Sequence, residues 1–122
     1  MTALIAGLAA GSPAVVLLAI NNLRDVASDR VSGKNTLAVR FGAAFAQAEV
    51  VVFALLPFAL FTMLALILHQ LAILITMLAV PLAAALIRRV KRSSGAELNG
   101  CLAMAGGFQW LLAILFVIGA LV

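Results

Sequence analysis

Four long apolar segments alternate with short polar stretches along the chain. A helix that crosses a bilayer needs about 20 predominantly apolar residues. Strands of membrane barrels are about ten residues long and alternate in polarity, whereas a helix satisfies its own backbone hydrogen bonds in lipid. The pattern therefore predicts an all-α membrane protein with four transmembrane helices, at about residues 2–20, 43–68, 71–87 and 99–122.

The polar positions between these segments predict the connections. His69 and Gln70 form the only polar break between the second and third segments, which indicates a tight turn. The second segment would be about 39 Å long as a helix, so we expect it to tilt or to start in the membrane interface. Residues 1–20 have no basic start and no clear cleavage signal, so we interpret them as a retained span rather than a signal peptide.

The two longer connections carry all eight Lys and Arg residues. Residues 21–42 contain four basic and two acidic residues, and residues 88–98 contain four basic and one acidic. Two spans separate these loops, so both lie on the same side of the membrane. The positive-inside rule predicts that this side is the cytoplasm and that both termini lie outside.

Composition supports this interpretation and excludes several classes of protein. Of 122 residues, 66% are hydrophobic and 10% are charged, against roughly 45–50% and 25% in soluble domains. A net charge of +4 would suggest nucleic acid in a soluble protein, but here we attribute it to basic loops beside lipid and expect no nucleic acid partner. The single cysteine excludes an internal disulfide and a metal site built from cysteines.

Candidate chemistry is concentrated after the first span. Asn21, Asp25 and Asp29 are spaced by four residues, so on a helix they form one stripe. Carboxylate and amide oxygens are suited to Mg²⁺, which commonly bridges one or two carboxylates to a substrate phosphate. Cations beside the stripe could bind the remaining phosphate oxygens. These cations are Arg24, Arg30 and Lys34.

A simpler interpretation of the same residues is also open. Charged residues at the end of a span are often solvated anchors, and Asp25 with Arg24, or Asp29 with Arg30, could only neutralise each other. The basic residues 88–92 are most simply a topology signal that anchors the chain to anionic lipid, with attraction of an anionic substrate as the alternative.

Residues 21–42, NNLRDVASDRVSGKNTLAVRFG, resemble the second aspartate-rich motif of the UbiA superfamily of membrane prenyltransferases. The form N-N-x-R-D-x-x-x-D-x-x-x-G-K-x-T is similar in particular to that of the 1,4-dihydroxy-2-naphthoate polyprenyltransferases of menaquinone synthesis (the MenA type). Residues 97–103, ELNGCLA, and the helix after them resemble the last span of that group. The resemblance runs over nearly the whole chain.

The resemblance implies a nine-helix bundle, of which this chain would be the C-terminal part, residues 1–122. The first aspartate-rich motif of the family has no counterpart here, so the N-terminal half of the enzyme would be a missing partner and the isolated chain should be inactive. It also implies a multi-pass protein of the cell inner (plasma) membrane, with its active-site loops in the cytoplasm.

The resemblance further implies roles for single residues. Asp25 and Asp29 would be catalytic and would hold Mg²⁺ on the diphosphate of an allylic polyprenyl donor, with Asn21 as a further metal ligand. The electron-rich ring of 1,4-dihydroxy-2-naphthoate would be the acceptor. The residues expected to bind substrate are Asn22, Arg24, Arg30 and Lys34.

Two alternatives stay open on sequence grounds. The acceptor could be another aromatic compound used within the same superfamily. The chain could instead be a non-enzymatic four-span membrane subunit, although no acidic residue lies in the middle of a predicted span, which disfavours proton or cation antiport.

Two further features predict helix packing. Gly7 and Gly11 form a G-x-x-x-G pattern in the first span, typical of close contact between helices. Gln109 and Trp110 lie near the middle of the fourth span beside Gly106 and Gly107, so we expect this face to turn into the bundle.

Overall fold

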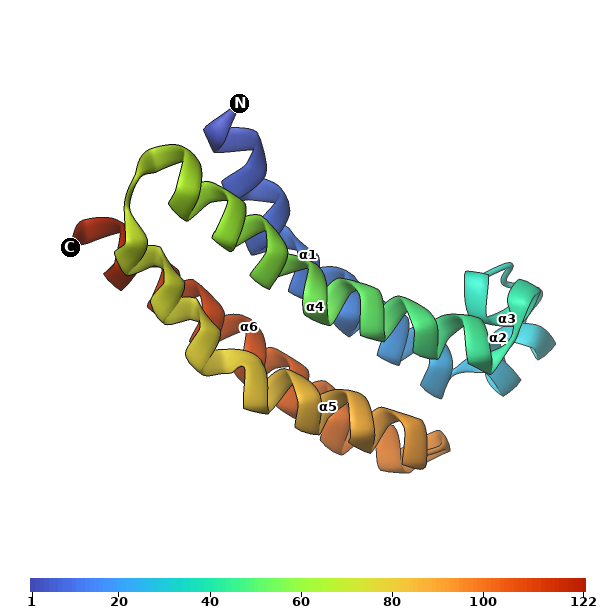
Figure 1. Cartoon of the computed structure of the whole chain (residues 1–122). Helices are drawn as coiled ribbons and strands as arrows, with labels where there is room; N and C mark the ends of the chain where they lie inside the picture. The colour runs from blue at the N-terminus through green and yellow to red at the C-terminus, as the bar shows by residue number, and fades with distance from the viewer.

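The computed structural model describes all 122 residues and contains helices and turns only (Figure 1). Four helical segments are long and apolar enough to cross a membrane, which confirms the predicted fold class. The elements, in chain order, are α1 (Thr2–Arg24), α2 (Val26–Val31), α3 (Leu37–Phe41), α4 (Ala43–Leu68), the 3₁₀ helix η1 (Leu71–Ala79), α5 (Val80–Arg92), the short 3₁₀ helix η2 (Gly95–Glu97) and α6 (Leu98–Leu121).

The long helices are arranged so that both polar connections lie together. In Figure 1, α1 runs beside α4, and η1 with α5 runs beside α6. Both termini lie near the turn that joins α4 to η1. The opposite end, which we call the loop end, carries α2, α3 and the connection from α5 to α6, residues 24–43 and 92–98. This arrangement agrees with the prediction that both basic loops share one side.

Small side chains and aromatic rings fill the core. Alanines at the helix contacts, such as Ala9, Ala54 and Ala105, are fully buried. Small residues allow helix backbones to approach closely, which is the main source of packing energy between helices in lipid. The rings of Phe61 and Phe116 stack with centroids 4.6 Å apart, so α4 and α6 are held together through aromatic contact as well.

The turn between α4 and η1 is closed by several contacts. His69 adopts a left-handed conformation with φ 52°, and the amide of Gln70 donates to the carbonyl of Ala65 at 2.9 Å. The Gln70 side chain also donates to the carbonyl of Ala120 at 3.0 Å. A Cβ at Gly119 would lie 2.6 Å from the carbonyl oxygen of Ala72, so α6 and η1 are in backbone contact here.

The third span differs from the uniform α-helix that the sequence predicted. Its first nine residues, Leu71–Ala79, form the 3₁₀ helix η1 before α5 begins. With a rise of about 2.0 Å per residue instead of 1.5 Å, η1 adds about 4–5 Å to a short segment. Pro81 lies in the first turn of α5, where its missing amide hydrogen leaves no helical bond unmade.

Two expectations about packing faces were wrong within this chain. Trp110 is 72% exposed and points away from the bundle. The buried face of α6 instead carries Phe108 and Leu112, and Trp110, two residues from each, falls on the opposite side of the helix. A Cβ at Gly7 or Gly11 would meet nothing within 4 Å, so this pair contacts no other helix of the chain.

Candidate functional site

The predicted acidic stripe lies at the loop end and is bent at its middle residue. Helix α1 continues past Ile20 to Arg24, and α2 begins at Val26. Between them Asp25 has φ −97° and ψ 7°, outside the helical basin. The amide of Asp25 still donates to Asn21 at 3.1 Å, and that of Asp29 to Asp25 at 2.8 Å. The stripe therefore follows a kinked path and not one straight helix.

Arg24 is the centre of the hydrogen bonds at this site. Its Nε lies 2.7 Å from Oδ1 of Asp25, and its Nη2 lies 2.8 Å from Oδ2. This two-pronged pairing is the strongest form of contact between a guanidinium and a carboxylate. Nη2 also donates to Oδ1 of Asn21 at 2.8 Å, and Nη1 donates to Oδ1 of Asn99 at 2.9 Å.

Asn99 also belongs to this network, although the sequence predicted no role for it. It lies in the first turn of α6, 75 positions after Arg24. Its only signal in the sequence was its place in the ELNGCLA stretch beside the second basic loop. The contact fixes the end of α1 to the start of α6.

The charge on Asp25 is set by its neighbours. The Arg24 guanidinium, through its hydrogen bonds and its charge, holds the pKa of the Asp25 carboxyl below its usual range, and Lys34 acts in the same direction. Asp25 is therefore ionised at neutral pH, the state that a metal ligand requires.

Asp29 forms a second pair with Lys34. Oδ1 of Asp29 lies 3.0 Å from Nζ of Lys34, and the Lys34 amide donates to the Asp29 carbonyl at 2.9 Å. Gly33, with φ 73°, makes the turn that brings Lys34 back over α2. The Asp29 side chain is only 8% exposed while that of Lys34 is 66% exposed, so the lysine covers the carboxylate from the water side.

The other two residues predicted to bind substrate, Asn22 and Arg30, form no ion pair. Arg30 is exposed, and the two ion pairs of the chain do not include it. Asn22 is half-buried. The anticipated neutralisation of Asp25 by Arg24 is present, whereas the partner of Asp29 is Lys34 and not Arg30.

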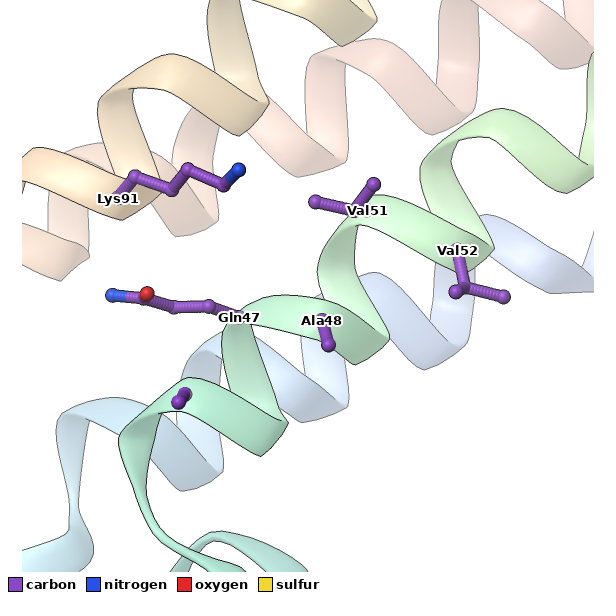
Figure 2. A pocket seen from close by; sticks show the side chains of 6 residues that line it. Gln47, Ala48, Val51, Val52 and Lys91 are labelled. Atoms are coloured by element: carbon purple, nitrogen blue, oxygen red, sulfur yellow. The ribbon is translucent and has the colours of Figure 1, made fainter.

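Two adjoining hollows open at the loop end. One, of about 220 Å³, lies between the junction of α1 and α2, the start of α4 and the connection to α6, and neither Arg24 nor Asp25 lines it. The other, of about 350 Å³, lies between α4 and α5 (Figure 2). Gln47 lines both. The remaining lining residues of the first are Leu23, Val26, Ala43, Ser93, Ser94, Gly95 and Leu98.

The oxygen-bearing residue types at the site are ones that a hard divalent cation such as Mg²⁺ prefers. The oxygens come from two carboxylates and one amide, and each carboxylate already faces a positive charge. No group of three or more His, Cys, Asp or Glu side chains gathers in the structure. Few protein ligands suit Mg²⁺, which retains several waters and binds through one or two carboxylates and substrate phosphates.

The fold and the loop end together define a class of protein. It is a helical, membrane-embedded chain with paired acidic and basic side chains at one end of the bundle. Comparison with curated proteins then gives a match over a short segment of the chain. A segment of 34 residues is 62% identical to part of the 1,4-dihydroxy-2-naphthoate octaprenyltransferase of Escherichia coli (strain K12). The segment covers 28% of this chain and 11% of that enzyme. It supports a relation to membrane prenyltransferases.

Comparison with models of protein families gives no match. Comparison with solved structures likewise gives no match.

Proposed function

We propose that this chain forms the part of a UbiA-type prenyltransferase that binds the diphosphate of the donor. The reaction would transfer a polyprenyl group from an allylic diphosphate to 1,4-dihydroxy-2-naphthoate in menaquinone biosynthesis. The observation that carries the proposal is the pair of acid–base contacts at one end of the bundle, Asp25 with Arg24 and Asp29 with Lys34. The short similarity to a prenyltransferase supports the same reaction class.

The arrangement suits a phosphate ligand because the cations can change partners. Lys34 is the more exposed partner of Asp29, so its ammonium can turn to a phosphate oxygen with little loss of packing. Arg24 has a planar fork of donors that fits phosphate as well as carboxylate. A bound Mg²⁺, held by Asp25 and Asp29 with Asn21 beside them, would supply Lewis-acid stabilisation of the leaving diphosphate.

The proposed reaction begins with ionisation of the donor, which places negative charge on the diphosphate. The bond between the allylic carbon and the diphosphate oxygen breaks, and its electron pair leaves on the diphosphate, whose added charge Arg24 and Lys34 stabilise. The allylic cation is attacked by the ring carbon that carries the carboxylate. Loss of that carboxylate as carbon dioxide restores the aromatic ring, so charge and atoms balance.

Placement in the membrane completes the proposal. We place the loop end in the cytoplasm, because all eight Lys and Arg residues lie at or near it, and we assign the chain to the inner membrane. The polyprenyl tail would lie between helices and lipid. A second acidic motif, from outside these 122 residues, would complete the active site.

The proposal is tested by donor binding, which does not require turnover. The chain is placed in nanodiscs, and binding of labelled farnesyl diphosphate is measured with and without Mg²⁺. We expect Mg²⁺-dependent binding that falls about tenfold or more in Asp25→Asn and in Asp29→Asn, equal to at least about 1.4 kcal/mol. Glu97→Gln, which removes one negative charge at the same end, is the matched control. Binding that is independent of Mg²⁺, or equal in all three variants, contradicts the proposal.

A further inference from the structure

The hollow between α4 and α5 combines an apolar wall with two polar groups. Ala44 and Ala48 on α4 leave space that larger side chains would fill, and Val51 and Val52 continue the same wall. Figure 2 shows Gln47 from α4 and Lys91 from α5 reaching into the space between these helices. A ligand that fits would have an apolar body and an anionic end.

Lys91 differs from the other basic residues at the end of α5. The guanidinium of Arg89 lies over α6, with its Nη2 2.5 Å from the position of a Cβ at Gly100. All four basic residues here are exposed, but Arg88 and Arg92 line neither hollow. Lys91 lines the larger hollow and takes part in neither ion pair of the chain, so its ammonium is available to a ligand.

The hollow also opens at the loop end, as does the proposed donor site. Gln47 lines both hollows. The smaller one is bounded by Leu23 and Val26, which flank the Arg24–Asp25 pair in the chain. A ligand held on Gln47 and Lys91 would therefore lie at the same end of the bundle as the proposed diphosphate site, whose charged residues line neither hollow.

We propose that this hollow binds the aromatic carboxylate acceptor, with its carboxylate on Lys91, a ring hydroxyl on Gln47 and its ring face against Val51. This proposal rests on the proposed function and names the residues that would hold its second substrate. A volume of about 350 Å³ is at the small end of ligand pockets, which suits a planar bicyclic acid and not the two acyl chains of a phospholipid. A hydroxyl beside the carboxylate matches the amide of Gln47, which can donate and accept.

The test measures acceptor binding alone, without Mg²⁺ or prenyl diphosphate. The chain is placed in phosphatidylcholine nanodiscs and titrated with 1-hydroxy-2-naphthoate, followed by its fluorescence. We expect saturable binding that weakens about tenfold in Lys91→Ala and stays within about threefold in Lys91→Arg, because arginine keeps the positive charge that pairs with the ligand carboxylate and alanine removes it. Arg92→Ala removes the same charge one residue away and should leave binding unchanged.

A second variant separates the hollow from general attraction to positive charge. Val51→Trp fills the apolar wall and keeps every charge, so it should abolish saturable binding while helical content and thermal midpoint stay near those of the parent chain. Equal losses in Lys91→Ala and Arg92→Ala, or undiminished binding in Val51→Trp, overturn the proposal. Displacement of the probe by a few per cent phosphatidylglycerol in a Lys91-dependent way also overturns it, because the occupant is then a lipid.

The two proposals can fail separately. If farnesyl diphosphate binds with Mg²⁺ dependence but the naphthoate does not bind, only the acceptor assignment is wrong. If the naphthoate binds through Lys91 while the donor binds without dependence on Asp25 and Asp29, only the donor site is wrong.

Discussion

Arg24 at the end of α1 and Asn99 at the start of α6 are joined by a hydrogen bond of 2.9 Å. The same guanidinium holds Asp25 with two other nitrogens. The first and last long helices are therefore connected through the arginine that also orients the proposed metal ligand. Removal of the Asn99 side chain would free one donor of Arg24 and leave the contact between Arg24 and Asp25 in place.

Asn99→Ala should lower stability modestly. The lost hydrogen bond involves a charged donor at an exposed position, so we expect a loss of about 0.5–1.5 kcal/mol in the free energy of unfolding. Asn99→Asp should recover most of it, since a carboxylate oxygen accepts from the guanidinium equally well. Unfolding in mixed detergent micelles, followed by circular dichroism, measures both variants, and an unchanged midpoint in Asn99→Ala contradicts the inferred role.

Gly119→Ala should destabilise the closed turn end of the bundle. Its added methyl would lie 2.6 Å from the backbone carbonyl oxygen of Ala72 and 2.8 Å from the Cα of Ile73. Because backbone cannot move aside as a flexible side chain does, we expect a loss of about 1–3 kcal/mol, as in other overpacked cores. Gly11→Ala is the control, since its methyl meets nothing, and it should stay within about 0.5 kcal/mol of the parent chain. Equal midpoints for the two variants would show that α6 and η1 are not in contact.

The ion pair of Asp25 predicts a specific pH dependence. Its pKa is lower in the folded chain than in the unfolded chain, where it is about 3.9. Its contribution to stability is thus fully present above pH values near 4–5 and disappears as pH falls through the lower, folded pKa. Asp25→Asn should lack this acid-sensitive part of the unfolding profile, while Glu97→Gln should retain it. A carboxyl ¹³C titration that places Asp25 above its ordinary value would contradict the pairing.

The isolated chain should not transfer a prenyl group. It contains one aspartate-rich motif, with Asp25 and Asp29, and the proposed reaction requires a second. In liposomes with Mg²⁺, farnesyl diphosphate and 1,4-dihydroxy-2-naphthoate, we expect no product above background. In a complete enzyme that contains this segment, Asp25→Asn and Asp29→Asn should each reduce turnover nearly to background, whereas Glu97→Gln should not. Turnover by the isolated chain would show that a second acidic motif is unnecessary.

The sequence predicted the number of membrane-length helices because a bilayer imposes a length of about 20 apolar residues on each crossing. It also predicted that the two basic loops share one end, because an even number of crossings separates them. It did not predict η1, since a 3₁₀ and an α-helical stretch differ little in their apolar pattern. The outward direction of Trp110 was missed because an all-round apolar helix gives no periodic signal for its buried face.

At the candidate site, the sequence predicted the types of residues but not their partners. The i, i+4 spacing placed Asp25 and Asp29 near each other, but the bend at Asp25 depends on local backbone angles that no motif specifies. Lys34 reaches Asp29 through the turn at Gly33, a contact between loop residues. Asn99 is 75 positions from Arg24, and only the packing of α1 against α6 brings the two together.

The 3₁₀ stretch η1 also determines which way α5 faces. Nine residues make 3.0 turns at three residues per turn but only about 2.5 turns at 3.6. If Leu71–Ala79 were α-helical, everything after Ala79 would be rotated by about half a turn, and Lys91 would point away from Gln47. The chemistry available at the loop end is thus decided at the far end of the bundle, by how tightly one short segment is wound.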